Sequence, residues 1–278
     1  MGMEKPEREF TIIGETASPI AILVTIPVHN EVRLLREAVN SLRTDLGRAL
    51  PSFQLAIAED GSSDGSKELL RHLCAGDSSL IVQMGESKCG RGLALRNLWS
   101  KLDASFYVFC DADLPCGSSA IINAVRLAEA GHPIVTASRY VQGSRVQRPV
   151  LRRAVSVAYN GLIRALFHDG IHDHQCGLKV FNKHTLERLL PHTTEDSWFW
   201  DTEILVIARK LGYPVYEMPV EWVEKRSRRT PIRRLVSDVY LHGSGLARLK
   251  LTLPSRVPPV NSRHPATREI SSEHPVSR

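Results

Sequence analysis

The chain contains the stretch Phe106-Tyr107-Val108-Phe109-Cys110-Asp111-Ala112-Asp113, five β-prone residues followed by two closely spaced carboxylates. The apolar run predicts a buried strand. Ligands of open α/β sheets bind at the carboxyl ends of the strands, and Mg²⁺ is commonly held by one or two carboxylates together with substrate phosphates. Asp111 and Asp113 therefore predict a metal–diphosphate site. The alternative is that these aspartates form a turn or cap a helix, and the rest of the sequence is needed to choose between the two interpretations.

The residues around this stretch alternate between strand and helix patterns. Apolar runs predict strands at 21–26, 53–58, 80–84, 106–110 and 133–137, and helical spacing predicts helices at 31–42, 64–73, 92–102 and 118–130. Strands that alternate with helices of this length favour right-handed βαβ units. We therefore predict an α/β fold, a three-layer α/β/α sandwich with a mainly parallel central sheet.

The pattern changes after residue 139. Helices are expected at 152–167, 183–190 and 201–211, and strands at 179–181 and 215–223. Apolar residues also recur at roughly helical spacing over 231–251, although Gly243 and Gly245 should interrupt a helix there.

Bulk composition indicates a soluble globular protein. The 278 residues are 42% hydrophobic and 24% charged, and no apolar stretch approaches the ~18–20 residues of a membrane span. Residues 1–10 are too charged for a secretory signal peptide. The five cysteines lack paired metal-type spacing, which favours reduced thiols and a cytoplasmic location.

Charge divides the chain unevenly. Residues 225–278 contain twelve Lys or Arg but three Asp or Glu, within a chain of net charge +6. Such a segment indicates an anionic partner or a solvated tail. The predicted organisation is a flexible leader (1–19), a catalytic domain (20–230, with halves 20–139 and 140–230), an amphipathic helix that could lie on a membrane surface (231–251), and a disordered basic, Pro-rich tail (252–278).

Two further strand ends carry polar side chains. The first reads Ile26-Pro27-Val28-His29-Asn30-Glu31, in which the polar groups could contact a nucleobase or ribose, or Asn30 could simply cap the next helix. The second reads Glu59-Asp60-Gly61-Ser62-Ser63-Asp64-Gly65-Ser66. Its carboxylates could accept hydrogen bonds from a uracil or ribose, or the segment could be an ordinary turn.

These two segments, Gly90-Arg91-Gly92 and Asp111-Ala112-Asp113 together resemble glycosyltransferase family 2 in order and spacing. The resemblance implies a GT-A-type domain that binds a nucleotide sugar. It implies a metal site for Mg²⁺ or Mn²⁺ at Asp111 and Asp113. The donor site that it implies consists of Pro27, His29, Glu31, Glu59, Asp60, Arg91 and Asp111. Glu59 departs from the family's frequent Asp but keeps the charge.

The second half narrows the resemblance. The segments 173–181 (DHQCGLKVF), 198–205 (WFWDTEIL) and 217–228 (EMPVEWVEKRSR) resemble polyprenyl-phosphate sugar synthases, most closely the dolichyl-phosphate glucosyltransferase branch. This resemblance implies inverting transfer of a hexose, with glucose from UDP-glucose favoured, to a polyprenyl phosphate. The enzyme would then work at the cytoplasmic face of a membrane as a peripheral protein.

Arginine side chains suit phosphate oxygens in both charge and geometry. The predicted acceptor-phosphate site consists of Arg139, Arg152, Arg153, Lys225 and Arg228, although the arginines near 152 could instead be a solvated helix start. The predicted catalytic residues are Asp113, Arg139, Asp173, Asp201 and Glu203. Asp201 and Glu203 would order the acceptor loop or act as base toward a hydroxyl acceptor.

Several alternatives stay open on the sequence alone. His168, His172, Asp173, His174 and Cys176 crowd together without usual zinc spacing. Trp198-Phe199-Trp200 could be core residues or a lip that meets lipid. A transferase acting on a sugar or protein hydroxyl and a non-catalytic nucleotide-sugar binder are the rival functions. Nucleic acid is not an expected partner, since no aromatic side chains interleave with the tail's arginines.

Overall fold

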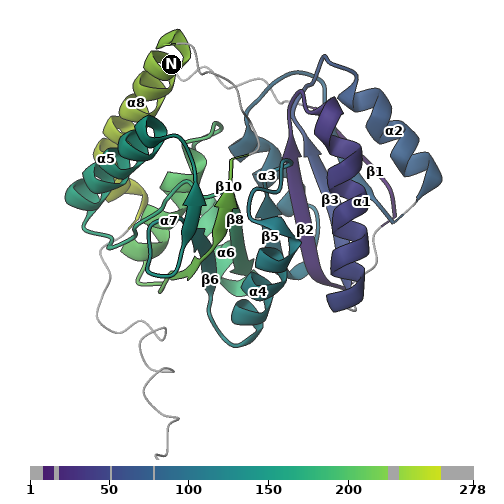
Figure 1. The fold of residues 1–278 in the computed structure, drawn as a ribbon, viewed down its shortest axis with the longest axis horizontal. Coiled ribbons are helices and arrows are strands. Elements are labelled where there is room, and N and C mark those ends of the chain that lie inside the picture. The colour runs from purple at the N-terminus through teal and green to yellow at the C-terminus, as the bar shows by residue number, and fades with distance from the viewer. Residues whose placement is uncertain (1–8, 16–18, 51, 78, 225–231, 258–278) are drawn as a thin grey trace, which may run out of the picture.

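The computed structural model describes residues 9–15, 19–50, 52–77, 79–224 and 232–257, and for residues 232–240 it describes the backbone alone. Within this part of the chain, helices cover both faces of an eight-stranded sheet (Figure 1). The strands run mainly parallel. The prediction of a three-layer α/β/α sandwich with a mainly parallel sheet is confirmed.

The sheet combines strands from both halves of the sequence. Its order is β1 (Phe10–Ile13), β4 (Ile81–Gly85), β3 (Phe53–Glu59), β2 (Ile20–Val28), β5 (Ala104–Cys110), β8 (Leu178–Asn182), β6 (Ile134–Ser138) and β9 (Tyr216–Pro219). β1 and β8 are the antiparallel members. β7 (Arg145–Gln147) and β10 (Glu221–Val223) form a separate parallel pair. The expected strand at 215–223 is therefore split between two sheets.

Alternating side chains of each strand supply two hydrophobic cores. On β2, Val24 and Ile26 join the core beneath α1 (Val32–Ala49), α2 (Ser66–Gly76) and α4 (Gly117–Glu129), whereas Leu23 joins the opposite core. That second core lies beneath α3 (Arg91–Trp99), α6 (Lys183–Leu189) and α7 (Trp200–Lys210). A short 3₁₀ turn, Leu190–His192, follows α6. The two-residue strand period thus fixes which helices lie on which face.

β8 brings the second half of the chain to the end of β5. Because it runs antiparallel between β5 and β6, its first residue, Leu178, lies opposite Cys110, the last residue of β5. Segment 173–177 therefore meets Asp111–Asp113, although the two are far apart in the sequence. The adjacent Lys179 lies opposite Phe109.

The two ends of the chain differ from the predicted organisation. Residues Phe10–Ile13 were expected in a flexible leader, but they form β1 and pair with β4 because the edge of β4 offers free backbone hydrogen-bonding groups. α8 (Ile232–Arg256) runs past the predicted end at residue 251 and is not interrupted at Gly243 or Gly245. Residues 258–278 of the predicted tail lie outside the described part.

The last turns of α8 pack onto the body of the protein, next to α5 (Val150–Phe167) (Figure 1). Leu246, Leu249 and Leu253 are buried in the second core. Gly245 faces the Phe199 ring, which lies 2.6 Å from where a Cβ atom would stand. The glycine that the sequence marks as a helix breaker therefore permits close packing of the helix. Within the described residues, no helix has the length and hydropathy that a membrane span requires.

This packing predicts opposite effects for two neighbouring glycines of α8. Gly245→Ala should lower the free energy of unfolding by about 1–3 kcal/mol, because the new methyl group overpacks against Phe199. Gly243→Ala is the matched control, since nothing lies within 4 Å of its Cβ position. It should stabilise the protein by up to about 1 kcal/mol through helix propensity.

Urea-induced unfolding followed by circular dichroism measures both changes. Equal stability of the two variants would contradict the described packing of α8.

Candidate active site

The direction of the connections reverses between β2 and β5. From β2 the chain proceeds through β3 to β4 on one side, and then returns to place β5 on the other side of β2. A reversal of this kind leaves a crevice at the carboxyl ends of the two strands, where open α/β sheets bind ligands. Segments Pro27–Glu31 and Asp111–Asp113 both follow these strands, so the predicted donor and metal residues converge there.

Polar side chains fasten the loops after β2 and β3 to each other. The Asn30 amide donates to Ser62 Oγ at 2.9 Å, and the Ser63 amide donates to Asn30 Oδ1 at 2.8 Å. Asn30 takes a left-handed backbone conformation, with φ of 59°. Asn30 therefore connects the two loops and does not cap the helix, which was the alternative interpretation of the sequence. Asp64 instead caps α1, because it accepts the backbone amide of Val32 at 3.1 Å.

Glu59 and Asp60 point into the protein. Glu59 is fully buried and accepts the amides of Ser62 and Gly85. Asp60 is 4% exposed and accepts the Gly90 amide at 2.9 Å and the Cys89 amide at 2.6 Å. Direct donor contact by Glu59 does not fit this geometry, since both of its oxygens bind backbone. Both residues instead position the loops, and Asp60 holds the start of α3.

The other donor residues of this edge are accessible. Pro27, His29 and Glu31 are each partly exposed. His29 Nδ1 lies 2.7 Å from the Asp60 carbonyl oxygen, so the Nδ1–H donates and the ring orientation is fixed. Partial exposure is compatible with the predicted contact of Pro27, His29 and Glu31 with a donor, which stays a prediction.

Asp111 and Asp113 are both partly exposed at the end of β5. The Asp111 amide donates to the Gly177 carbonyl oxygen at 3.0 Å, which fixes the start of this turn against β8. A Cβ atom at residue 177 would overlap the Asp111 carboxylate. The glycine of the QCG segment is thus required by the position of Asp111.

A chain of four charged side chains runs inward from Asp111. Arg91 Nη1 donates to Asp111 Oδ1 at 3.1 Å, and Arg91 Nη2 pairs with Asp201 Oδ2. Lys179 Nζ lies 3.7 Å from the other oxygen of Asp201 and donates to the Cys176 carbonyl at 2.8 Å. Burial lowers the pKa of Lys179 to about 7, an effect that the Cys176 thiol opposes and Arg91 reinforces.

Lys179 was not among the predicted site residues. Its sequence context, Leu178-Lys179-Val180-Phe181, predicts a strand, and a lysine within it suggests a solvent-facing position. Lys179 is fully buried, because helices cover both faces of the sheet to which its strand belongs. A lysine that is predicted to lie in such a strand requires a counter-ion, and this requirement is the signal that could have revealed it. Asp201 supplies that counter-ion, so a role as a free general base does not fit the described contacts.

Arg139 and Asp173 form a second buried pair. Arg139 Nε and Nη2 donate to the two oxygens of Asp173 at 2.7 and 2.8 Å. Burial alone would raise the pKa of Asp173, but the charge and hydrogen bonds of Arg139 hold it below the usual range. The guanidinium also stacks 4.8 Å from the Trp222 ring. The predicted contact of Arg139 with the acceptor phosphate does not fit this pairing, because Nε and Nη2 of its guanidinium already donate to Asp173.

Of the other predicted phosphate-binding residues, Arg152 and Arg153 lie in the first turn of α5. Arg148 and Arg152 pair with the two oxygens of Glu224 at 2.9 and 2.7 Å, and Arg153 is exposed. Lys225 and Arg228 lie outside the described residues.

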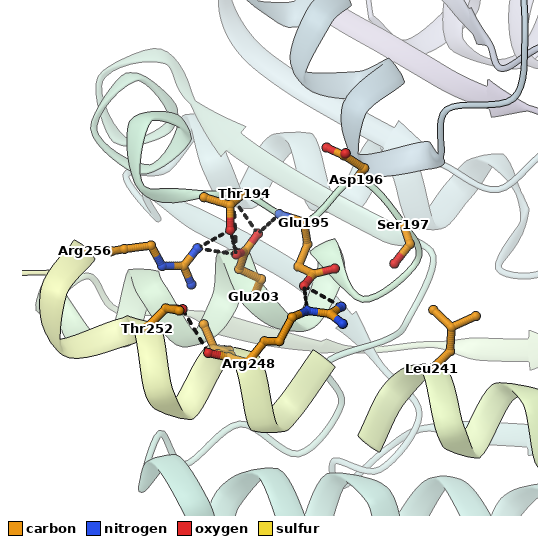
Figure 2. A pocket seen from close by; sticks show the side chains of 10 residues that line it. Thr194, Glu195, Asp196, Ser197, Glu203, Leu241, Arg248, Thr252 and Arg256 are labelled. Carbon is orange, nitrogen blue, oxygen red and sulfur yellow. Dashed lines mark hydrogen bonds and ion pairs between the residues drawn. The ribbon is translucent and has the colours of Figure 1, made fainter. Parts of the chain in front are cut away.

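Glu203 does not reach this edge. It is fully buried and accepts the backbone amides of Thr194 and Glu195 at about 3 Å, as well as Arg256 Nη1 at 2.6 Å. Figure 2 shows this group beside a pocket of about 440 Å³, where Arg248 of α8 also pairs with Glu195. The predicted catalytic role of Glu203 does not fit, because its carboxylate holds loop 193–197 to α8.

The histidine-rich loop is held by internal contacts. His174 is buried between Asn160 Oδ1 (2.9 Å) and Asp169 Oδ2 (2.8 Å). Among the described residues, no three His, Cys, Asp or Glu side chains gather as a metal site. The WFW segment is divided: Phe199 and Trp200 are core residues, and Trp198 is 54% exposed and stacks 3.8 Å over Arg91.

The fold and this edge define an α/β protein in which carboxylates, glycine-rich turns and basic residues gather at the carboxyl ends of parallel strands. Residues 23–190 match the Glycosyl transferase family 2 model. The chain belongs to glycosyl transferase family 2, as the sequence motifs predicted.

Two curated relatives are similar over most of the chain. Glycosyltransferase AglD of Haloferax volcanii is 32% identical over 247 residues, which cover 87% of this chain and 39% of AglD. The dolichyl-phosphate beta-glucosyltransferase of Saccharomyces cerevisiae is 25% identical over 232 residues, 74% of this chain and 67% of the yeast protein. The chain thus spans well under half the length of AglD.

A solved structure has the same fold. Glucosyl-3-phosphoglycerate synthase of Mycobacterium tuberculosis, in complex with Mn²⁺, UDP and phosphoglyceric acid, superposes with a TM-score of 0.60 at 19% identity. The match covers 88% of this chain and 81% of the synthase. The predicted GT-A fold is confirmed.

Asp111 and Asp113 fit a divalent cation on chemical grounds. Both offer carboxylate oxygens, the ligands that Mg²⁺ and Mn²⁺ accept, and both are partly exposed at the crevice. Gly177 leaves the Asp111 carboxylate its space. Two carboxylates leave further coordination positions for diphosphate oxygens, which is consistent with the use of a divalent metal.

Proposed function

We propose that this protein transfers a hexose from a nucleoside diphosphate sugar to a polyprenyl phosphate, with inversion at the anomeric carbon. The observation that carries the proposal is the convergence of Asp111 and Asp113 with the loops after β2 and β3 at the β2/β5 crevice. The names of the relatives support a lipid phosphate as acceptor and glucose as the sugar. UDP-glucose is accordingly the favoured donor.

On the donor side, Pro27, His29 and Glu31 would contact the nucleoside, and Asp60 would position the adjoining loop. Mg²⁺ or Mn²⁺ held by Asp111 and Asp113 would supply Lewis-acid stabilisation of charge on the leaving diphosphate. Asp60 would also hold the start of α3 in place, through the backbone amide of Gly90.

On the acceptor side, the chemistry requires orientation more than deprotonation. A phosphate monoester has its second pKa near ~6, so its oxygen is already ionised at neutral pH. Asp201 and Glu203 are both engaged in buried ion pairs, which agrees with a reaction that needs no carboxylate base. Arg152, Arg153, Lys225 and Arg228 would hold the acceptor phosphate for attack on the anomeric carbon.

The proposal predicts lipid-soluble product. Labelled UDP-glucose, a short polyprenyl phosphate and Mn²⁺ should give label in the organic phase, and Asp113→Ala should reduce the rate at least ~100-fold, as loss of charge stabilisation does. Asp103→Ala is the matched control, because Asp103 precedes β5 at its opposite end and is 64% exposed. It should retain the wild-type rate.

GDP-mannose run in parallel identifies the nucleotide and the sugar. Full metal-dependent transfer by Asp113→Ala would refute the metal assignment. Transfer to a sugar or protein hydroxyl but not to the lipid phosphate would favour the rival acceptor, and nucleotide binding without turnover would favour a non-catalytic binder.

A lipid acceptor requires contact with a membrane, and we propose that the outer face of α5 makes it, at the cytoplasmic leaflet. Val150, Leu151 and Leu162 are 83%, 68% and 50% exposed, and Val157 is 46% exposed. These residues follow helical spacing along one face. The sequence of α5 contains three arginines and no Asp or Glu. An apolar stripe on a basic helix matches an anionic leaflet in both hydrophobicity and charge.

Vesicle flotation tests this contact. The wild type should float with phosphatidylserine-containing vesicles at low salt, and Leu151→Gln combined with Leu162→Gln should reduce the bound fraction several-fold. Tyr216→Gln, which removes an exposed aromatic ring at β9, is the control and should float like the wild type. Undiminished flotation of the double variant would refute the assignment. A solution dimer that the double variant lost would assign the face to a second copy of the chain.

A further inference from the structure

Arg91 contacts the first aspartate of the predicted metal pair directly. Its Nη1 lies 3.1 Å from Asp111 Oδ1, and the two side chains are 6% and 20% exposed. An arginine and a divalent cation that use the same carboxylate oppose each other, because both are positive and compete for the same oxygen. The contact therefore bears on how the site takes up a metal ion.

The surroundings hold Arg91 in this position. Its Nη2 pairs with Asp201, whose side chain is 1% exposed, and its guanidinium lies 3.8 Å over the Trp198 ring. Lys179 pairs with the other oxygen of Asp201 at 3.7 Å. Two basic and two acidic side chains thus alternate, so Arg91 already supplies positive charge beside Asp111 without a metal ion. A divalent cation added alone would leave this low-dielectric cluster with uncompensated positive charge.

We infer that Arg91 stands in for the metal ion at Asp111 in the free protein and releases this carboxylate when metal and nucleotide bind together. The inference rests on the metal–nucleotide site of the proposed function. The diphosphate supplies the negative charge that a metal ion alone lacks. It also offers Arg91 a new partner, since a guanidinium pairs with phosphate oxygens as well as with a carboxylate.

Arg91 is on this account a positioning residue that couples the two ligands. Metal alone binds weakly because Arg91 must be displaced without compensation. Metal together with nucleotide binds tightly because the displaced Arg91 side chain then pairs with the diphosphate. Coupling between two ligands is reciprocal, so Mn²⁺ strengthens UDP binding by the same factor as UDP strengthens Mn²⁺ binding.

Mn²⁺ binding measured by electron paramagnetic resonance, with and without UDP, tests this role apart from activity. Arg91→Gln removes the competing cation, so Mn²⁺ without nucleotide should bind at least ~5-fold more tightly than to the wild type, the lower end of typical coupling. The enhancement of Mn²⁺ binding by UDP should shrink correspondingly. Arg91→Lys keeps the positive charge and should restore weak binding of Mn²⁺ alone.

Asp201→Asn should have the opposite effect. It leaves Arg91 and Lys179 without their shared anion, so more positive charge acts on Asp111 and Mn²⁺ alone should bind ~5-fold more weakly. A merely structural role would make both substitutions weaken Mn²⁺ binding. Asp201→Asn also tests the inference should Arg91→Gln fail to fold, as judged by circular dichroism. Arg43→Gln, which breaks a pair with Asp77 away from the crevice, is the control.

The outcomes separate this inference from the proposed function. A wild type that bound neither UDP nor Mn²⁺ would refute the proposed function. A wild type that bound both, with Arg91→Gln holding Mn²⁺ no more tightly, would overturn the role of Arg91 alone. Unchanged Mn²⁺ binding by Asp201→Asn would overturn it as well.

Discussion

The neutralisation of charge at the carboxyl end of β5 is the constraint on which the rest of the structure depends. Arg91, Asp111, Asp201 and Lys179 come from four separate segments and form one chain of ion pairs. Buried charges lose their hydration, and removing one partner leaves another uncompensated. The GRG, DAD, QCGLK and WFWD segments therefore depend on one another at this edge of the sheet.

A second set of contacts supports the same edge from outside. Arg248 and Arg256 of α8 pair with Glu195 and Glu203 (Figure 2). Arg96 of α3 pairs with Asp196 of the same loop, 193–197. Gly90 and Gly92 let this loop approach the start of α3 closely, since a Cβ at either position would overlap it. The last turns of α8 thereby stabilise loop 193–197, which packs against the start of α3 at Gly90 and Gly92. The C-terminal helix is part of the architecture of the candidate site.

Local patterns were sufficient for much of this fold. The apolar run of β5 and the acidic residues after it predict both the strand and the exposure of Asp111 and Asp113, because strand ends depend on nearby residues. The burial of Glu59 could not be predicted, since it depends on Gly85, 26 residues away in β4. The sequence around Arg139 gives no local sign of its pairing with Asp173, which is 34 residues distant. The role of Lys179 could not be predicted, because the periodicity of the sequence does not show that an antiparallel strand lies between β5 and β6.

In the proposed function, Asp111 and Asp113 together hold a divalent cation against a nucleoside diphosphate. The most direct measurement is the anomalous scattering of Mn²⁺ in crystals grown with UDP. The account predicts a single strong peak in contact with carboxylate oxygens of both aspartates and with the diphosphate. Bound UDP with the Mn²⁺ peak elsewhere, or with no peak beside these two residues, would contradict it.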